Sequence, residues 1–174
     1  MTPENLKNEL WAAQRIARRL ELSIKSTGSL IPFSAERIQV INDDQQEKID
    51  ALLLRFVSLA SMIQDRIGRS VLLLEEEDLT TASKKDMRHM LEKLGAIQKE
   101  REFGIIAELR NIIAHVYPED LERQAAILNA VHRRGQDLLD SLKDLLDYTR
   151  RKFLGKSHHE SRSIDDESCE PPAP

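Results

Sequence analysis

The sequence has little of what builds disulfide-bonded, β-rich or membrane-spanning proteins. Its one cysteine, Cys169, can form no internal disulfide, and this is typical of a chain in the reducing cytoplasm. Aromatic residues make up only 4% of the chain and charged residues 32%, which favours solvated helices over a β-sandwich. No apolar run is long enough for a membrane helix, and the first residues lack a basic-then-apolar secretion signal. We expect a cytoplasmic protein without membrane contact.

An excess of positive charge is also missing. The net charge is −4, from 26 basic and 30 acidic residues. Residues 157–174 hold five acidic residues and one arginine, so the preceding 156 residues are balanced. Binding of nucleic acid would therefore depend on local patches of lysine and arginine, and such patches are more often plain solvated helix faces. Two patches qualify: Arg15, Arg18 and Arg19; and Lys84, Lys85, Arg88 and Lys93.

Apolar residues recur every three or four positions along most of the chain, and no useful stretch alternates with period two. This pattern predicts an all-α protein with one helical domain over residues 1–154. Residues 155–174 are rich in serine, acidic residues and proline, which predicts a disordered tail. The expected helices are Pro3 to about Thr27 with Thr2 as cap, a short helix from Ser34 to Ile41, Asp43 to Leu74, Ser83 to Gly95, Glu100 to His115, and Pro118 to Phe153.

The most informative segment is the end of the fifth predicted helix, where Arg110, Asn111, His115 and Tyr117 stand within eight residues. At about 100° per residue, the first three fall within about 140° of one another. The predicted core arc lies opposite them. It consists of Ile105, Ile106, Leu109, Ile112, Ile113 and Val116. We therefore expect this helix to bury its isoleucine side and to hold Arg110, Asn111 and His115 together on the other.

These side chains suit chemistry on a phosphodiester. A guanidinium can bind two phosphate oxygens at once, and a histidine can exchange a proton near neutral pH. Asn111 lies four residues before His115, so its amide could orient the ring or a phosphate. Together they could support cleavage of RNA by its own 2′-hydroxyl. On spacing alone, however, a solvated polar face or a structural capping role is the commoner meaning of such a helix.

The segments MRHMLEKLGAI (residues 87–97) and ELRNIIAHVYPED (residues 108–120) resemble the HEPN superfamily. The similarity is greatest to the HepT-like toxins of HEPN/MNT toxin–antitoxin pairs. Their signature is R-x-x-x-x-H, with a polar residue after the arginine and a tyrosine two positions beyond the histidine. Arg110, Asn111, His115 and Tyr117 match each of these elements, and no other histidine of the chain has an arginine five residues before it.

This resemblance implies an antiparallel bundle of four to five helices that pairs as a symmetric homodimer. It implies a metal-independent endoribonuclease toxin of a type VII-like system, with Arg110 and His115 as catalytic residues and Asn111 in support. The substrate would be tRNA or mRNA, and no cofactor is expected. In the HepT branch, the tyrosine matched by Tyr117 is modified with AMP by the nucleotidyltransferase antitoxin, which would neutralise the toxin.

Two other interpretations stay open. The chain could be a non-catalytic helical module that binds or dimerises with a nucleotidyltransferase, or an unrelated helical adaptor that carries the motif by chance. No cluster of Cys, His and carboxylate residues has metal-ligand spacing along the sequence. We expect His89 and His132 to be plain surface residues. The lack of a glycine-rich phosphate loop argues against an NTPase.

Overall fold

The computed structural model describes residues 1–115 and 119–155. All regular structure in this part of the chain is helical, which confirms the all-α prediction. The helices are α1 (Pro3–Thr27), α2 (Ala35–Gln39), α3 (Asp43–Ser61), α4 (Gly68–Leu74), α5 (Lys84–Lys93), α6 (Glu100–Ile113) and α7 (Leu121–Thr149), with a 3₁₀ turn at Gly28–Leu30 (η1) and π-helical segments at Met62–Ile67 (η2) and Arg150–Leu154 (η3).

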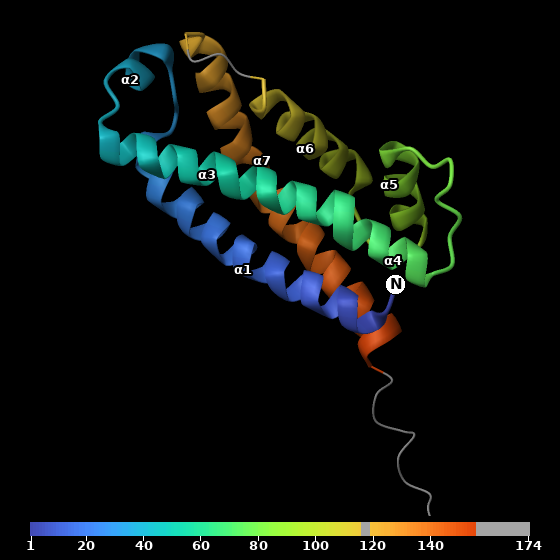
Figure 1. Ribbon diagram of the computed structural model, residues 1–174. Helices are drawn as coiled ribbons and strands as arrows, with labels where there is room; N and C mark the ends of the chain where they lie inside the picture. The colour runs from blue at the N-terminus through green and yellow to red at the C-terminus, as the bar shows by residue number, and fades with distance from the viewer. Residues whose placement is uncertain (116–118, 156–174) are drawn as a thin grey trace, which may run out of the picture.

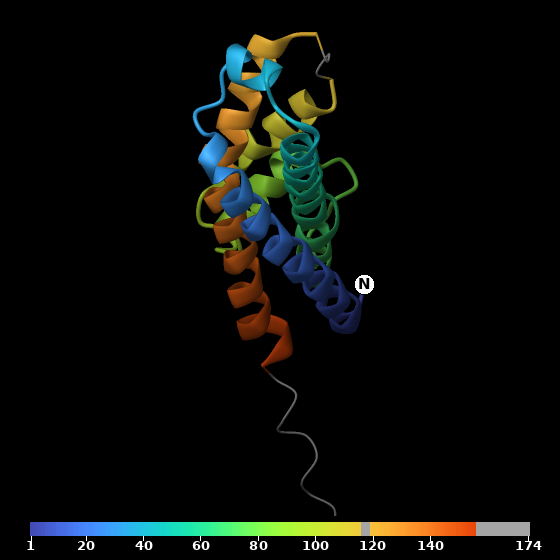
Figure 2. The same cartoon turned by 90° about the vertical axis from the view of Figure 1, so that its left-hand side faces the viewer.

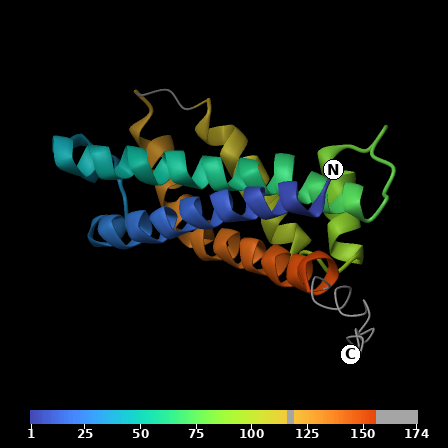
Figure 3. The same cartoon turned by 60° about the horizontal axis from the view of Figure 1, so that its bottom comes forward.

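Four helical rods lie side by side and alternate in direction (Figures 1 and 2). In chain order they are α1, the continuous rod of α3, η2 and α4, then α6, and finally α7. The rod that begins with α3 packs against α1 and α6, and α7 packs against the same two helices. The short helix α5 covers one end beside α4 and α6, and α2 covers the other end beside α7 (Figures 1 and 3).

The apolar stripes predicted from the sequence meet in one main core. Leu20 of α1, Phe56 of α3, Phe103 of α6 and Leu138 of α7 are all fully or almost fully buried there. Fully burying a side chain of this size stabilises the fold by roughly 1.5–3 kcal/mol. A smaller cluster under α2 contains Phe33, Ile49, Ala125 and Leu128. The two clusters account for the apolar stripes of the long amphipathic helices.

Local capping chemistry sets most helix ends as predicted. Thr2 accepts a hydrogen bond from the backbone N–H of Asn5 at the start of α1. Ser83 and Asp86 form the predicted capping box of α5. Gly95, which follows α5, has a φ of 70°, a left-handed conformation that glycine adopts at little cost. The turn at Gly95 directs the chain back toward the start of α6.

Some helices differ from the prediction in their course or bounds. The long rod is not α-helical throughout, because η2 widens it between α3 and α4. Helix α6 ends at Ile113 instead of His115, with Ala114 as its C-terminal cap. Helix α7 begins at Leu121, where the carboxylate of Asp120 accepts a hydrogen bond from the N–H of Arg123. The proline predicted to open that helix, Pro118, lies outside the described residues.

Within the described ranges, no helix combines the length and the apolar composition needed to cross a bilayer. The last helical segment of the described residues, η3, ends at Leu154. Of the predicted tail, only Gly155 belongs to the described residues, and residues 156–174 lie outside them.

Candidate functional site at the end of helix α6

The burial of α6 confirms part of its predicted core arc and shifts the centre of that arc by about a quarter turn. Ile106, which belongs to the predicted arc, is fully buried. Phe103 and Ala107, which precede Arg110 by seven and three residues, are buried, whereas Ile105 and Ile112 are 37% and 40% exposed. Arg110 therefore lies on the inward-facing side of the helix, and its side chain is only 14% exposed. The prediction was wrong only in part, because the packing of α6 against α3 and α7 selects an arc that also includes Phe103, Ala107 and Arg110.

Arg110 crosses to the neighbouring rod and binds it. Its Nη1 donates to Oδ2 of Asp65 at 3.0 Å and to Oγ of Ser61 at 3.3 Å. Ser61 ends α3, and Asp65 lies one turn later in η2. A π-helical turn of this kind occurs often at functional sites. The two contacts fix one end of the guanidinium between two helices.

The opposite edge of the same guanidinium contacts Asn111. The Nε and Nη2 atoms donate to Oδ1 of Asn111 at 3.3 and 3.0 Å. This edge offers two parallel N–H groups, the geometry with which arginine binds a carboxylate or phosphate in a bidentate manner. Here the acceptor is a neutral amide oxygen from the next residue in the chain, and Asn111 itself is exposed. The edge is therefore accessible from solvent once the amide turns aside.

His115 is exposed and lies beyond the end of the helix. Its backbone N–H donates to the carbonyl of Ile112 at 3.0 Å, so a single turn connects it to α6. The structure thus places Arg110, Asn111 and His115 at one end of α6, in different surroundings: Arg110 is largely buried, whereas Asn111 and His115 face solvent. Tyr117, the predicted modification site, lies outside the described residues.

Asp65 is the electrostatic centre of this arrangement. Besides Arg110, its carboxylate binds Nζ of Lys84 at 2.7 Å. Partial burial works to raise the pKa of Asp65, but the hydrogen bonds and positive charges of Lys84 and Arg110 outweigh it and lower the pKa below its usual value. One carboxylate thus faces two cations, so these three groups together carry a net positive charge.

A cavity of about 510 Å³ lies beside the C-terminal end of α6, but the candidate site residues do not line it. It lies between α2, α3, α6 and α7. Its lining is largely aliphatic and includes Ile38, Ile49, Leu53, Ile113 and Leu128, but none of Arg110, Asn111 and His115. The candidate site therefore lies outside this cavity, with Asn111 and His115 exposed at the surface.

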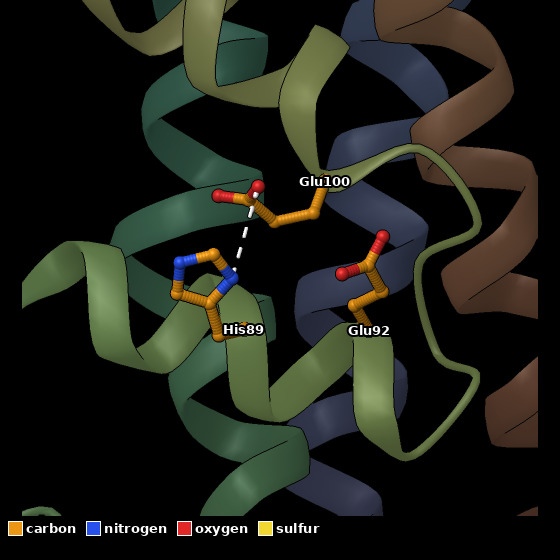
Figure 4. A group of neighbouring side chains, drawn as sticks. All are labelled: His89, Glu92 and Glu100. Atoms are coloured by element: carbon orange, nitrogen blue, oxygen red, sulfur yellow. Dashed lines mark ion pairs between the residues drawn. The ribbon is translucent and has the colours of Figure 1, made fainter.

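A second polar cluster, absent from the sequence prediction, lies between α5 and α6. His89, Glu92 and Glu100 converge so that one ligand atom from each lies within 4.8 Å of the others (Figure 4). His89 and Glu92 are three residues apart on α5, a spacing visible in the sequence. Glu100 is the first residue of α6 and joins them only because the chain reverses after Gly95. No local spacing rule could have added it.

The prediction for His132 also needs correction, because this histidine is half-buried. Its Nε2 lies 2.8 Å from Oγ1 of the buried Thr27, and burial lowers its pKa below 6.5. His132 connects α7 to α1 and is far along the sequence from the motif. Its role is structural.

No protein-family model matches this chain, and a search of curated proteins gives no match either.

Proposed function

We propose that the chain is a metal-independent endoribonuclease of the HEPN type, a toxin that acts as a homodimer on tRNA or mRNA. The observation that carries this proposal is the state of the Arg110 guanidinium. It is anchored at Nη1 by Asp65 and Ser61, while its Nε and Nη2 edge donates to the amide oxygen of Asn111. The motif histidine follows five residues later and is exposed.

In this proposal, an RNA phosphate replaces the amide oxygen of Asn111 on the bidentate edge of Arg110. The anchored guanidinium then needs little reorganisation to stabilise charge that develops on the phosphate, and this kind of preorganised donor contributes about 2.7–4 kcal/mol in other enzymes. Asn111 turns aside and holds the phosphate or the ring of His115. A phosphate displaces a neutral amide oxygen from Arg110 at a lower free-energy cost than it would displace a carboxylate, because hydrogen bonds between two charged groups are stronger.

His115 supplies proton transfer. The 2′-oxygen attacks phosphorus, the bond from phosphorus to the 5′-oxygen breaks, and a 2′,3′-cyclic phosphate and a 5′-hydroxyl form. One imidazole takes the proton of the 2′-hydroxyl, and a second donates a proton to the leaving 5′-oxygen. In a symmetric dimer the second imidazole is the partner subunit's His115, because a twofold axis brings the same surface of both copies together.

In this proposal, modification of Tyr117 neutralises the toxin. Transfer of AMP to its hydroxyl by a nucleotidyltransferase antitoxin adds bulk and negative charge two residues from His115, which repels RNA phosphates. Incubation with such an antitoxin and ATP should add the mass of one AMP residue to the peptide that contains Tyr117. If Tyr117→Phe is still neutralised by the catalytic action of the antitoxin, this part of the proposal is wrong.

The second candidate is a non-catalytic module that pairs with a nucleotidyltransferase. It is favoured by the exposed apolar side chains Ile105 and Ile112, two turns apart on α6, and by the largely intramolecular use of the Arg110 donors. Such a surface can bind a protein partner without any chemistry at His115.

Cleavage of total tRNA and of a model mRNA by the purified full-length protein in EDTA separates the two candidates. The ribonuclease proposal expects cutting by the wild-type protein and none by His115→Ala, which should keep its fold because His115 is exposed. His89→Ala is the matched control and should cut normally. Absence of cutting by the unmodified wild-type dimer would favour the binding module, and equal cutting by wild type and His115→Ala would refute the assignment.

A further inference from the structure

The cluster of His89, Glu92 and Glu100 has the composition of a metal site. An imidazole nitrogen and two carboxylate oxygens converge from two helices (Figure 4). Nδ1 of His89 lies 3.8 Å from Oε2 of Glu100, which is too long for a hydrogen bond. Ligand atoms that share one tetrahedral or octahedral cation are about 3 Å apart when the bonds to the metal are about 2.0–2.2 Å. A modest contraction of the cluster would therefore allow one ion to bind all three groups.

Glu100 is oriented for this role by Arg88. Nε of Arg88 donates to Oε1 of Glu100 at 3.2 Å, and the two side chains are only 15% and 13% exposed. The arginine thus holds one carboxylate oxygen and leaves Oε2 directed toward His89. A hydrogen-bonded second partner of this kind fixes the orientation of carboxylates that bind metals.

Glu92 completes the set and has no competing partner. Its carboxylate is exposed, and no hydrogen bond or ion pair engages it within the described residues. Of the other nearby charges, Asp86 is held by Ser83 in the capping box at the start of α5. Arg88 balances one of the two carboxylates, so the other leaves a negative charge in the cluster, which favours a cation there.

We propose that His89, Glu92 and Glu100 bind a divalent transition-metal cation, Zn²⁺ in the first instance. A mixed set of one nitrogen and two oxygen ligands suits Zn²⁺ and its first-row neighbours, whereas Mg²⁺ and Ca²⁺ prefer oxygen ligands alone. Three protein ligands leave the remaining coordination positions to water. The ion would connect α5 to the first residue of α6 and stabilise their junction.

Titration of the metal-free full-length protein with Zn²⁺, followed by calorimetry, tests this proposal. The wild-type protein should bind one equivalent that Glu92→Gln and His89→Gln each weaken at least tenfold. Both variants change exposed or half-buried side chains and should keep the wild-type circular dichroism spectrum. The matched control is Glu108→Gln, an exposed glutamate on α6 outside the cluster, which should bind as the wild type does. Mg²⁺ in place of Zn²⁺ should give no comparable binding.

Two results would overturn the proposal: no binding of Zn²⁺ by the wild-type protein, or equal binding by wild type, Glu92→Gln and His89→Gln. The second result would place the ion elsewhere in the chain. The ribonuclease proposal is independent of this one, because its cleavage assay contains EDTA, which keeps Zn²⁺ from the wild type and from every variant.

Discussion

Arg88 on α5 and Arg110 on the adjacent helix α6 make similar ion pairs, but different polar groups surround the two pairs. Arg88 is 15% exposed and binds Glu100 at 3.2 Å, and Arg110 is 14% exposed and binds Asp65 at 3.0 Å. Each pair joins two helices. By burial and distance alone, neither arginine could be singled out as functional.

The groups around each pair make the difference. Asp65 also binds Lys84 as a second cation, and the Nε and Nη2 edge of Arg110 donates to the neutral amide of Asn111. Glu100 instead faces His89, with a second carboxylate, Glu92, close by. The groups around Arg110 carry excess positive charge, which favours an anion. The groups around Glu100 carry excess negative charge, which favours a cation. The charged and polar groups that contact an ion pair, and not the pair itself, therefore indicate which kind of ligand could bind there.

The largest expected difference between the two arginines is in catalysis. Arg110→Ala should lower RNA cleavage in EDTA by about 10²–10³-fold, because it removes the donors that stabilise charge on the phosphate. Arg88→Ala should leave cleavage per folded molecule unchanged. Single-turnover rates on a labelled RNA, normalised to the folded fraction, measure both. Equal losses in the two variants would mean that Arg110 acts only through the fold.

For the free energy of unfolding we expect the opposite order, with the larger loss in Arg88→Ala. Arg88→Ala leaves Glu100, whose side chain is 13% exposed, without its arginine partner, and such a loss costs about 1–3 kcal/mol. Arg110→Ala should cost less, because Asp65 is 37% exposed and keeps Lys84. Urea unfolding followed by circular dichroism gives both free energies. A larger loss for Arg110→Ala would contradict the proposed difference between the pairs.

Substitutions at Asn111 test whether its amide holds the place of a phosphate. Asn111→Asp puts a carboxylate on the bidentate edge of Arg110, which competes with RNA, and it should lower cleavage at least tenfold, or about 1.4 kcal/mol. Asn111→Ala uncovers the same edge and should lower cleavage less. Comparison of KM and kcat for both variants provides the measurement. If Asn111→Ala is the more damaged of the two, the amide has a direct role in place of the proposed one.

The smallest expected effect concerns His132, a histidine that belongs to neither cluster. Burial lowers its pKa in the folded state below 6.5. The unfolded chain therefore binds more protons than the folded chain as the pH falls through about 6.5, and the free energy of unfolding should decrease there. Urea unfolding between pH 7.5 and 5 should give a flatter pH profile for His132→Gln. Identical profiles for the two proteins would contradict this assignment.

Local chemistry made much of the fold predictable from the sequence. Thr2, the pair Ser83 and Asp86, and Gly95 determine helix ends through contacts within a few residues, and each was placed correctly. The burial of Arg110 was not predictable in this way. It depends on Asp65, which lies 45 residues earlier in the sequence and comes within reach only when α3 and α6 pack together.

The difference between local and long-range contacts also explains why the sequence indicated the Arg110 motif but not the whole cluster of His89, Glu92 and Glu100. The Arg110, Asn111 and His115 motif lies within six residues, so the sequence alone could predict that these groups lie near one another. The cluster of His89, Glu92 and Glu100 requires a chain reversal between helices, and only its first two members have recognisable spacing. The exposure of Ile105 and Ile112 was missed because a hydrophobic pattern alone cannot tell which apolar side chains the packing of the helices leaves exposed.

The most direct test of the central proposal uses one RNA in two forms, all-ribose and with a single 2′-deoxyribose at the cleavage site, incubated with the wild-type protein in EDTA. We expect the all-ribose strand to give a 2′,3′-cyclic phosphate and a 5′-hydroxyl, and the deoxy strand to stay intact at that position. Arg110→Ala and His115→Ala should leave both strands intact. Cleavage of the deoxy strand at the same position, or cyclic phosphate formed equally by His115→Ala, would contradict the role assigned to the end of α6.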